Sequence, residues 1–253
     1  MGKLKRLAGE TVLYGLGSII PRFLNFLLVP LHTGVFAPEE YGIITKLLAY
    51  TAVINTVYMF GMETAYFRFA NKPGADQQKI FNLAQSVVVM VSGVLTIALV
   101  ALAVPIAHAL EISTRPDLVI TLAVIMFIDA IVAIPFARLR LLKKALQFVS
   151  FKLTNVFVLV GLNVYFLWFS PGNVTDVGFV FLANLIANGF YIFFFFQLLL
   201  SWRPVFNRDL SPQMFSYAYP IMLTGVAGVT NEMFSRLTLV AWLPEIFYEG
   251  QSN

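Results

Sequence analysis

Seven long apolar stretches, separated by short charged or turn-rich connections, dominate this sequence. A run of about 20 apolar residues is long enough to cross a bilayer as an α-helix. The third and sixth stretches are the clearest, because no Lys, Arg, Asp or Glu lies between Lys79 and Glu111 or between Asp176 and Arg203. We therefore predict an all-α, polytopic transmembrane helix bundle, with spans at about 11–36, 40–70, 80–110, 116–138, 151–170, 177–202 and 212–243.

The composition supports a membrane protein. Hydrophobic residues make up 59% of the chain and charged residues 12%, against roughly 45–50% and about 25% in soluble domains. Cysteine is absent, which excludes disulfides and thiol-ligated metals. The two histidines show no metal-binding spacing with Asp or Glu. We expect no metal, no cofactor and no nucleic-acid partner.

The positions of Lys and Arg predict the topology. Thirteen of the 17 fall on the same side as the N-terminus, whereas Arg115 is alone in the connections of the opposite side. Positively charged connections stay in the cytoplasm, so the N-terminus is expected to be cytoplasmic and the protein to reside in a bacterial inner membrane. The basic, amphipathic segment 138–152 is expected to lie along the cytoplasmic membrane surface, as a simple connection or as a lipid or partner site.

Two turns on the outer side are similar in sequence. Residues 37–42 read APEEYG and residues 243–250 read LPEIFYEG. Asn25 and Asn231 each lie thirteen residues before the proline of their turn, and each preceding span contains a proline in its cytoplasmic half. Internal repeats of this kind are typical of transporter folds.

The repeat predicts how the chain is divided. If the seventh span restarts the pattern of the first, one six-helix lobe is followed by the first helix of a second lobe. We expect this chain to be a fragment that lacks the rest of that second lobe. The expected parts are a cytoplasmic lead at 1–10, a six-helix lobe at 11–203, and a loop with the first helix of the second lobe at 204–253.

Three segments carry a family resemblance: GLGSIIPRFLNFLLVPLHTGVFAPEEYGIITKL near the start, the basic connection after the fourth span, and SYAYPIMLTGVAGVTNEMFSR in the seventh. They resemble the polysaccharide-biosynthesis flippases of the multidrug/oligosaccharidyl-lipid/polysaccharide exporter superfamily, over essentially the whole chain. The resemblance implies two six-helix lobes around a central cavity that opens alternately to each side. It also implies outward movement of undecaprenyl-linked sugars.

The diphosphate is the part of such a lipid that is hardest to move through hydrocarbon, so cations are expected inside the spans. Arg22 is the leading candidate, and on a helix it shares a face with Asn25 and His32. The alternative is that Arg22 pairs with Asp129 or Glu63. Substrate binding and internal pairing both remain open at this stage.

Three further cations have two interpretations each. Arg236 lies four residues after Glu232, which favours an internal ion pair, but it would line a cavity if the repeat is real. Lys46 either reaches the cavity or extends to the external interface. Arg68 either anchors the cytoplasmic end of its span or guards the inner mouth of the cavity.

Polar and acidic residues complete the predicted site. Asn25, Asn55, Tyr58 and Asn231 are expected to line the cavity, with core packing as the alternative. Glu63 and Asp129 could bind a coupling proton or Na⁺, or could form salt bridges with intramembrane cations.

The preferred function is a flippase that moves a lipid-linked oligosaccharide diphosphate by alternating access, with membrane lipids and the absent lobe as partners. The alternative is a proton- or Na⁺-coupled multidrug antiporter of the same superfamily. A membrane enzyme acting on lipid-linked glycans is the weakest alternative, because the connections are short and hold no cluster of catalytic groups.

Overall fold

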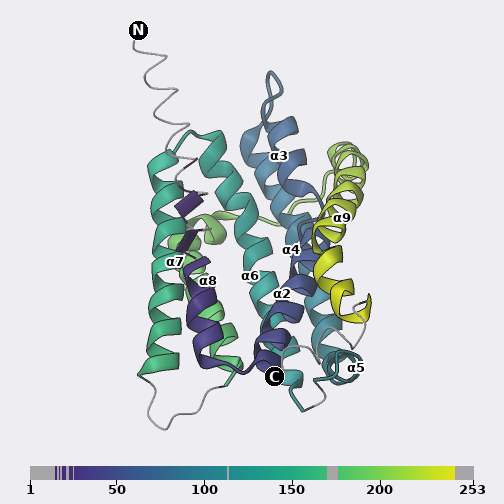
Figure 1. The fold of residues 1–253 in the computed structure, drawn as a ribbon. Helices are drawn as coiled ribbons and strands as arrows, with labels where there is room; N and C mark the ends of the chain where they lie inside the picture. The colour runs from purple at the N-terminus through teal and green to yellow at the C-terminus, as the bar shows by residue number, and fades with distance from the viewer. Residues whose placement is uncertain are drawn as a thin grey trace, which may run out of the picture.

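The structure is a computed structural model, and it describes residues 15, 17, 19–20, 23–24, 26–112, 114–169 and 176–242, with side chains as far as 232. These residues form a helical bundle without strands (Figure 1). The first helix is described continuously from Phe26 to Val35. The others are α2 (Pro38–Met59), α3 (Met62–Ala70), α4 (Gln77–Ala101), α5 (Ala103–Ala109), α6 (Pro116–Leu141), α7 (Ala145–Trp168), α8 (Gly178–Ser201) and α9 (Leu210–Trp242).

Within the described part of the chain, five helical stretches are long and apolar enough to cross a membrane. One is formed by α2 and α3 together, and the other four are the single helices α4, α6, α7 and α8. The protein is therefore an all-α, multi-pass membrane protein, as the sequence predicts. Acidic residues such as Glu39, Glu111 and Asp117 lie at the end of the bundle where α2 and α6 begin. We call this the acidic end. Lys72, Lys79 and the turn between α6 and α7 lie at the opposite, basic end.

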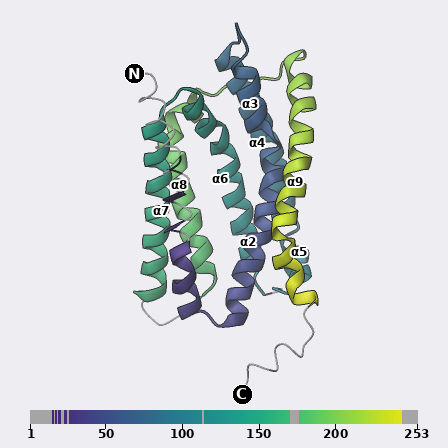
Figure 2. The same ribbon diagram turned by 45° about the horizontal axis from the view of Figure 1, so that its top comes forward.

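Helix α6 lies at the centre of the bundle. It packs against α4 on one side and α8 on the other, and it also contacts α2, α3, α5 and α7 (Figures 1 and 2). Its composition explains this position, because most of its residues between Leu118 and Leu139 are apolar and buried. Helix α9 packs against α2 and α3.

The second predicted span is broken by a sharp turn. Phe60 and Gly61 have φ angles of 49° and 65°, so both adopt the left-handed conformation between α2 and α3. Gly61 also lies against α9, where a Cβ atom would come within 2.5 Å of the carbonyl oxygen of Ala218. Only glycine provides both the positive φ and this close approach.

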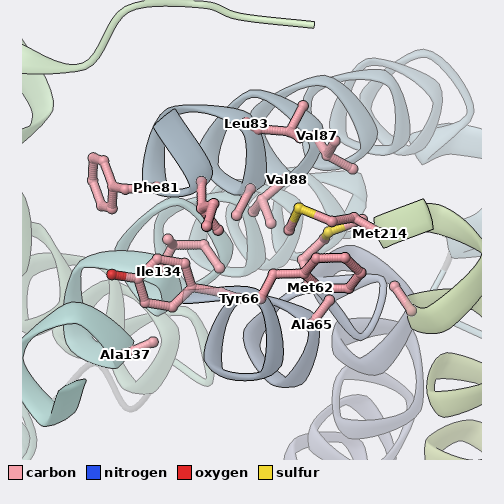
Figure 3. Close-up of a cluster of buried hydrophobic side chains, with 14 of the residues drawn as sticks. Met62, Ala65, Tyr66, Phe81, Leu83, Val87, Val88, Ile134, Ala137 and Met214 are labelled. Atoms are coloured by element: carbon pink, nitrogen blue, oxygen red, sulfur yellow. The ribbon is translucent and has the colours of Figure 1, made fainter. Parts of the chain in front are cut away.

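A large apolar cluster holds the basic half of α9 in place. Met62 and Tyr66 of α3, Phe81 of α4 and Ile134 of α6 are almost completely buried together with Met214 of α9 (Figure 3). Burial of one such side chain stabilises a fold by roughly 1.5–3 kcal/mol relative to exposure to water. The cluster thus ties Met214 of α9 to side chains of three helices that precede it by 80 residues or more.

Two predicted boundaries were wrong. The third span ends at Ala101, and a separate short helix, α5, follows; Pro105 cannot donate a backbone hydrogen bond to the preceding turn, which favours this interruption. Segment 138–152 is also not a surface segment, because α6 continues to Leu141 and α7 begins at Ala145. Its apolar residues Leu139, Phe148 and Val149 are buried in one cluster with residues of α6 and α8.

At the acidic end, Arg115 joins the beginnings of α6 and α8. Its guanidinium lies 3.0 Å from a carboxylate oxygen of Asp117 and 2.7 Å from one of Asp176, while the Gly178 N–H donates to Asp176 at 2.6 Å. Burial opposes ionisation of Asp176, but Gly178 and Arg115 outweigh it and hold the pKa of this carboxyl below its usual value.

Replacing Asp176 by asparagine is expected to lower the melting temperature slightly. The groups are partly exposed, so the loss should be about 1 kcal/mol or less. Because the folded-state pKa is depressed, the ionised carboxylate stabilises the fold above its ordinary pKa, and this contribution disappears as pH falls through the folded-state pKa. Wild type and Asp176→Asn should therefore differ at about pH 7, and the difference should shrink as the pH falls below the ordinary Asp pKa of about 3.9. A difference independent of pH would contradict this role.

Candidate functional site

A cavity of about 370 Å³ lies in the basic half of the bundle, between α2, α3, α6, α7 and α8. Four ionisable side chains line it: Glu63, Asp129, Arg140 and Lys152. All four belong to helices that are long and apolar enough to span a membrane. We call this space the charged cavity. Charges are costly at such positions and generally mark functional sites.

Glu63 of α3 and Arg140 of α6 form an ion pair across the cavity. Both side chains are about one third exposed (34% each). The guanidinium also lies over two aromatic rings, with its carbon 5.2 Å from the ring centre of Phe67 and 5.6 Å from that of Phe148. Its buried Nε has no described hydrogen-bond acceptor. The side chain of Arg140 is thus held by Glu63 and by the two rings, with its Nε enclosed in the bundle.

Asp129 of α6 ends a chain of amide hydrogen bonds. The Asn188 Nδ2 of α8 donates to Asp129 Oδ1 at 2.9 Å, and the Asn155 Nδ2 of α7 donates to Asn188 Oδ1 at 2.9 Å. Asn155 and Asn188 are both buried. The chain fixes the position of the carboxylate and connects three helices through polar groups.

Lys152 of α7 provides the second cation. Its ammonium lies 4.4 Å from the ring centre of Phe136 and 5.0 Å from that of Tyr191, and it interacts electrostatically with Asp129. Among the described contacts this ammonium makes no hydrogen bond. Its three N–H donors are thus held between aromatic rings at the cavity and remain open to a ligand.

Helical periodicity places these side chains together. Asp129, Phe136 and Arg140 recur on α6 at intervals of seven and four residues, and Lys152 follows Phe148 by one turn on α7. Sequence reasoning missed Arg140 and Lys152, because both were counted as positive charges of a cytoplasmic connection. The spacing on α6 is the signal that would have found Arg140.

Three residues predicted for the site do line the charged cavity: Asn55, Glu63 and Asp129. The Oδ1 atom of Asn55 is buried and has no described hydrogen-bond partner. Glu63 and Asp129 lie beside the cations Arg140 and Lys152. Neither cation was predicted from the sequence to interact with these carboxylates.

Three other predicted residues lie elsewhere. Lys46 donates to the carbonyl oxygen of Leu110 at 3.1 Å and lies 3.4 Å from Glu111, at the acidic end. Arg68 is exposed, with its guanidinium 4.1 Å from the ring centre of Tyr217 on α9. Tyr58 is completely buried, and its hydroxyl shares a hydrogen bond of 3.1 Å with that of Thr96. The structure does not bring these three together with the cavity.

The remaining predictions fall on the edge of the described region or outside it. Arg22 and Asn25 lie outside the described residues, and the side chain of Arg236 lies outside the described side chains. Asn231 is exposed on α9, as is Glu232. Within the described residues, no group of three or more His, Asp or Glu side chains is placed to hold a metal ion.

Comparison with known proteins gives one finding. A family described as "Polysaccharide biosynthesis protein" matches residues 35–243, which include all of α2 to α9. No curated protein and no solved structure matches the chain.

Proposed function

Because the chain belongs to the polysaccharide biosynthesis protein family, we propose that it flips an undecaprenyl-linked oligosaccharide across the bacterial inner membrane by alternating access. The single observation that supports this best is the charged cavity, which places Arg140 and Lys152 inside a bundle of membrane-spanning helices. We further propose that the basic end and the N-terminus face the cytoplasm, as the distribution of Lys and Arg indicates.

The donors at the cavity suit a diphosphate. Arg140 places a guanidinium at the cavity, and the ammonium of Lys152 makes no described hydrogen bond there. Charge-assisted hydrogen bonds to phosphate oxygens are among the strongest in proteins. Without a bound substrate, the carboxylates of Glu63 and Asp129 compensate the charges of the two cations. This reduces the free-energy cost of holding Arg140 and Lys152 within the membrane. A diphosphate would compete with these carboxylates for the same cations. This competition weakens diphosphate binding enough for the ligand to be released again.

Reconstitution of the purified full chain into vesicles tests the function. Lipid-linked oligosaccharide extracted from the host is incorporated, and its accessibility to an added glycosidase is followed with time. Vesicles with the protein should expose oligosaccharide from the inner leaflet, whereas empty vesicles should not. Equal, slow exposure in both would contradict flipping by this chain.

Arg22 and Arg236 remain proposed cation contacts for the same diphosphate. In the host, Arg22→Ala and Arg236→Ala are expected to lower surface polysaccharide and raise the level of its lipid-linked precursor, by about tenfold each, the effect of losing one charged hydrogen bond. Lys46→Ala is the matched control, because the Lys46 ammonium is held at the acidic end by Leu110 and Glu111. Normal polysaccharide and precursor levels in both arginine variants would contradict their role.

A cation-coupled multidrug antiporter is the second candidate, favoured by the two carboxylates in the same cavity. It predicts that transport follows a proton or Na⁺ gradient and that Asp129→Asn or Glu63→Gln abolishes it. Flipping of a lipid diphosphate instead predicts that the loss of Lys152 lowers transport more than Asp129→Asn or Glu63→Gln does. Transport measured in vesicles with and without an imposed gradient distinguishes the two.

A further inference from the structure

A second cavity, of about 290 Å³, lies in the acidic half of the bundle between the first helix, α2, α7 and α8. Its polar lining consists of His32, Tyr41, Thr45, Asn163 and Asn184. No Lys, Arg, Asp or Glu is among its described lining residues. We call it the neutral cavity, and its chemistry differs from that of the charged cavity.

Hydrogen-bonding capacity in the neutral cavity is only partly used. The buried His32 Nε2–H donates to Asn163 Oδ1 at 3.0 Å, and Asn163 Nδ2 donates to the carbonyl oxygen of Leu159 at 2.8 Å. The side-chain amide of Asn184 and the hydroxyl of Tyr41 have no partner among the described hydrogen bonds. Two donor and acceptor groups that line the cavity are thus open to a ligand.

A row of asparagines connects the two cavities along α7 and α8. On α8, Asn184 and Asn188 are one turn apart and share a face. On α7, Asn155 and Asn163 are two turns apart and share a face too. Asn155 and Asn188 are hydrogen-bonded to each other and, through Asn188, to Asp129 in the charged cavity. A row of polar side chains, buried in its middle part, therefore runs from one cavity towards the other inside an apolar bundle.

We propose that the neutral cavity binds a sugar ring of the oligosaccharide whose diphosphate occupies the charged cavity; this rests on the proposed function. Neutral amide, imidazole and hydroxyl groups match the hydroxyls of a sugar, and the ring of Tyr41 in the lining matches its apolar face. A volume of about 290 Å³ is at the lower limit of ligand pockets, which range over about 300–1,000 Å³, and suits a single ring.

The spacing of the cavities indicates which ring is bound. Lys152 and Asn163 are 11 residues apart on α7, which corresponds to about 16 Å along the helix axis. This separation exceeds the length of one sugar ring. The ring in the neutral cavity is therefore a later one in the oligosaccharide than the sugar attached to the diphosphate.

Single-cysteine labelling tests the proposal directly, because the chain contains no cysteine. Leu48→Cys places a thiol at the neutral cavity and Met59→Cys at the charged cavity, and neither removes a polar group. Phe157→Cys, at an exposed position on α7, is the control outside both cavities. Each purified variant is labelled with a maleimide in the presence of farnesyl diphosphate or of lipid-linked oligosaccharide extracted from the host.

The two probes should give different patterns of protection. At a probe concentration of about ten times its Kd, a covered thiol is expected to react about tenfold more slowly. Oligosaccharide should protect Leu48→Cys and Met59→Cys, farnesyl diphosphate should protect Met59→Cys alone, and neither should protect Phe157→Cys. Protection of Met59→Cys by both probes with Leu48→Cys unprotected would overturn the sugar site and leave the proposed function standing. If Met59→Cys is unprotected by either probe, the proposed function itself is contradicted.

A second variant separates sugar contact from coverage by the lipid tail. Asn184→Leu removes the amide at similar size, and it is expected to weaken oligosaccharide binding about tenfold, the effect of one lost hydrogen bond with a polar group left unpaired. Binding of farnesyl diphosphate should not change. Unchanged oligosaccharide binding in Asn184→Leu would show that the cavity holds only water or lipid.

Discussion

Replacing Lys152 by methionine is expected to lower transport of lipid-linked oligosaccharide about 100-fold, which corresponds to about 2.8 kcal/mol of lost interaction with the diphosphate. Methionine keeps most of the volume and the apolar contacts with Phe136 and Tyr191 but removes the ammonium. The change is measured as the initial rate of oligosaccharide exposure in vesicles. Lys152→Arg should retain most of the rate, because it keeps a cation at the cavity.

The single variant also removes the cation that interacts electrostatically with Asp129, and an uncompensated charge in the bundle is destabilising. The double variant Asp129→Asn/Lys152→Met removes both charges and keeps the hydrogen bond from Asn188 possible. It is expected to recover the melting temperature of the wild type but not its transport. If the double variant transports normally, Lys152 has only a structural role.

Replacing Gly61 by alanine is expected to destabilise the fold by about 2 to 4 kcal/mol, the sum of a left-handed backbone for a residue with a Cβ and an overpacked contact. The new Cβ would lie 2.5 Å from the carbonyl oxygen of Ala218, so α9 must move away from the break between α2 and α3. A decrease in melting temperature of about 10 °C is expected for a chain of this size. Faster hydrogen exchange in α9 should accompany it.

Gly42→Ala is the matched control on the same span. A Cβ at Gly42 meets no atom within 4 Å, and its φ is not in the left-handed region. Alanine is preferred over glycine inside a helix by roughly 0.5–1 kcal/mol, so this variant should be as stable as the wild type or slightly more stable. Equal behaviour of Gly61→Ala and Gly42→Ala would contradict the close contact with α9.

Much of the fold could be predicted from hydropathy and charge. The charge-free runs that become α4 and α8 are long enough to require a membrane, and positive charges gather at one end of the bundle. The interruptions at Gly61 and Leu102 were not predicted. Both lie inside continuous apolar sequence, and the break at Gly61 depends on its contact with Ala218, which is more than 150 residues away in the chain.

The site was predicted only in its acidic and amide parts. Asn55, Glu63 and Asp129 lie in apolar sequence, so their polarity is conspicuous. Arg140 lies three residues before Lys143 and Lys152 eight residues after Lys144, and a count of positive charges assigns all of them to one cytoplasmic connection. Their inward positions follow from a turn of only three residues between α6 and α7. The neutral cavity depends on four helices meeting, and no local pattern indicates it.

Equilibrium binding of farnesyl diphosphate tests most directly whether the charged cavity recognises a diphosphate. Calorimetric titration compares the wild type with Asp129→Asn/Lys152→Met, which has the same net charge, and with Lys46→Ala as a control at the acidic end. We predict wild-type affinity for Lys46→Ala and about 100-fold weaker binding for the double variant, the loss of a charged contact. Equal affinity in the wild type and a correctly folded double variant would contradict diphosphate binding in this cavity.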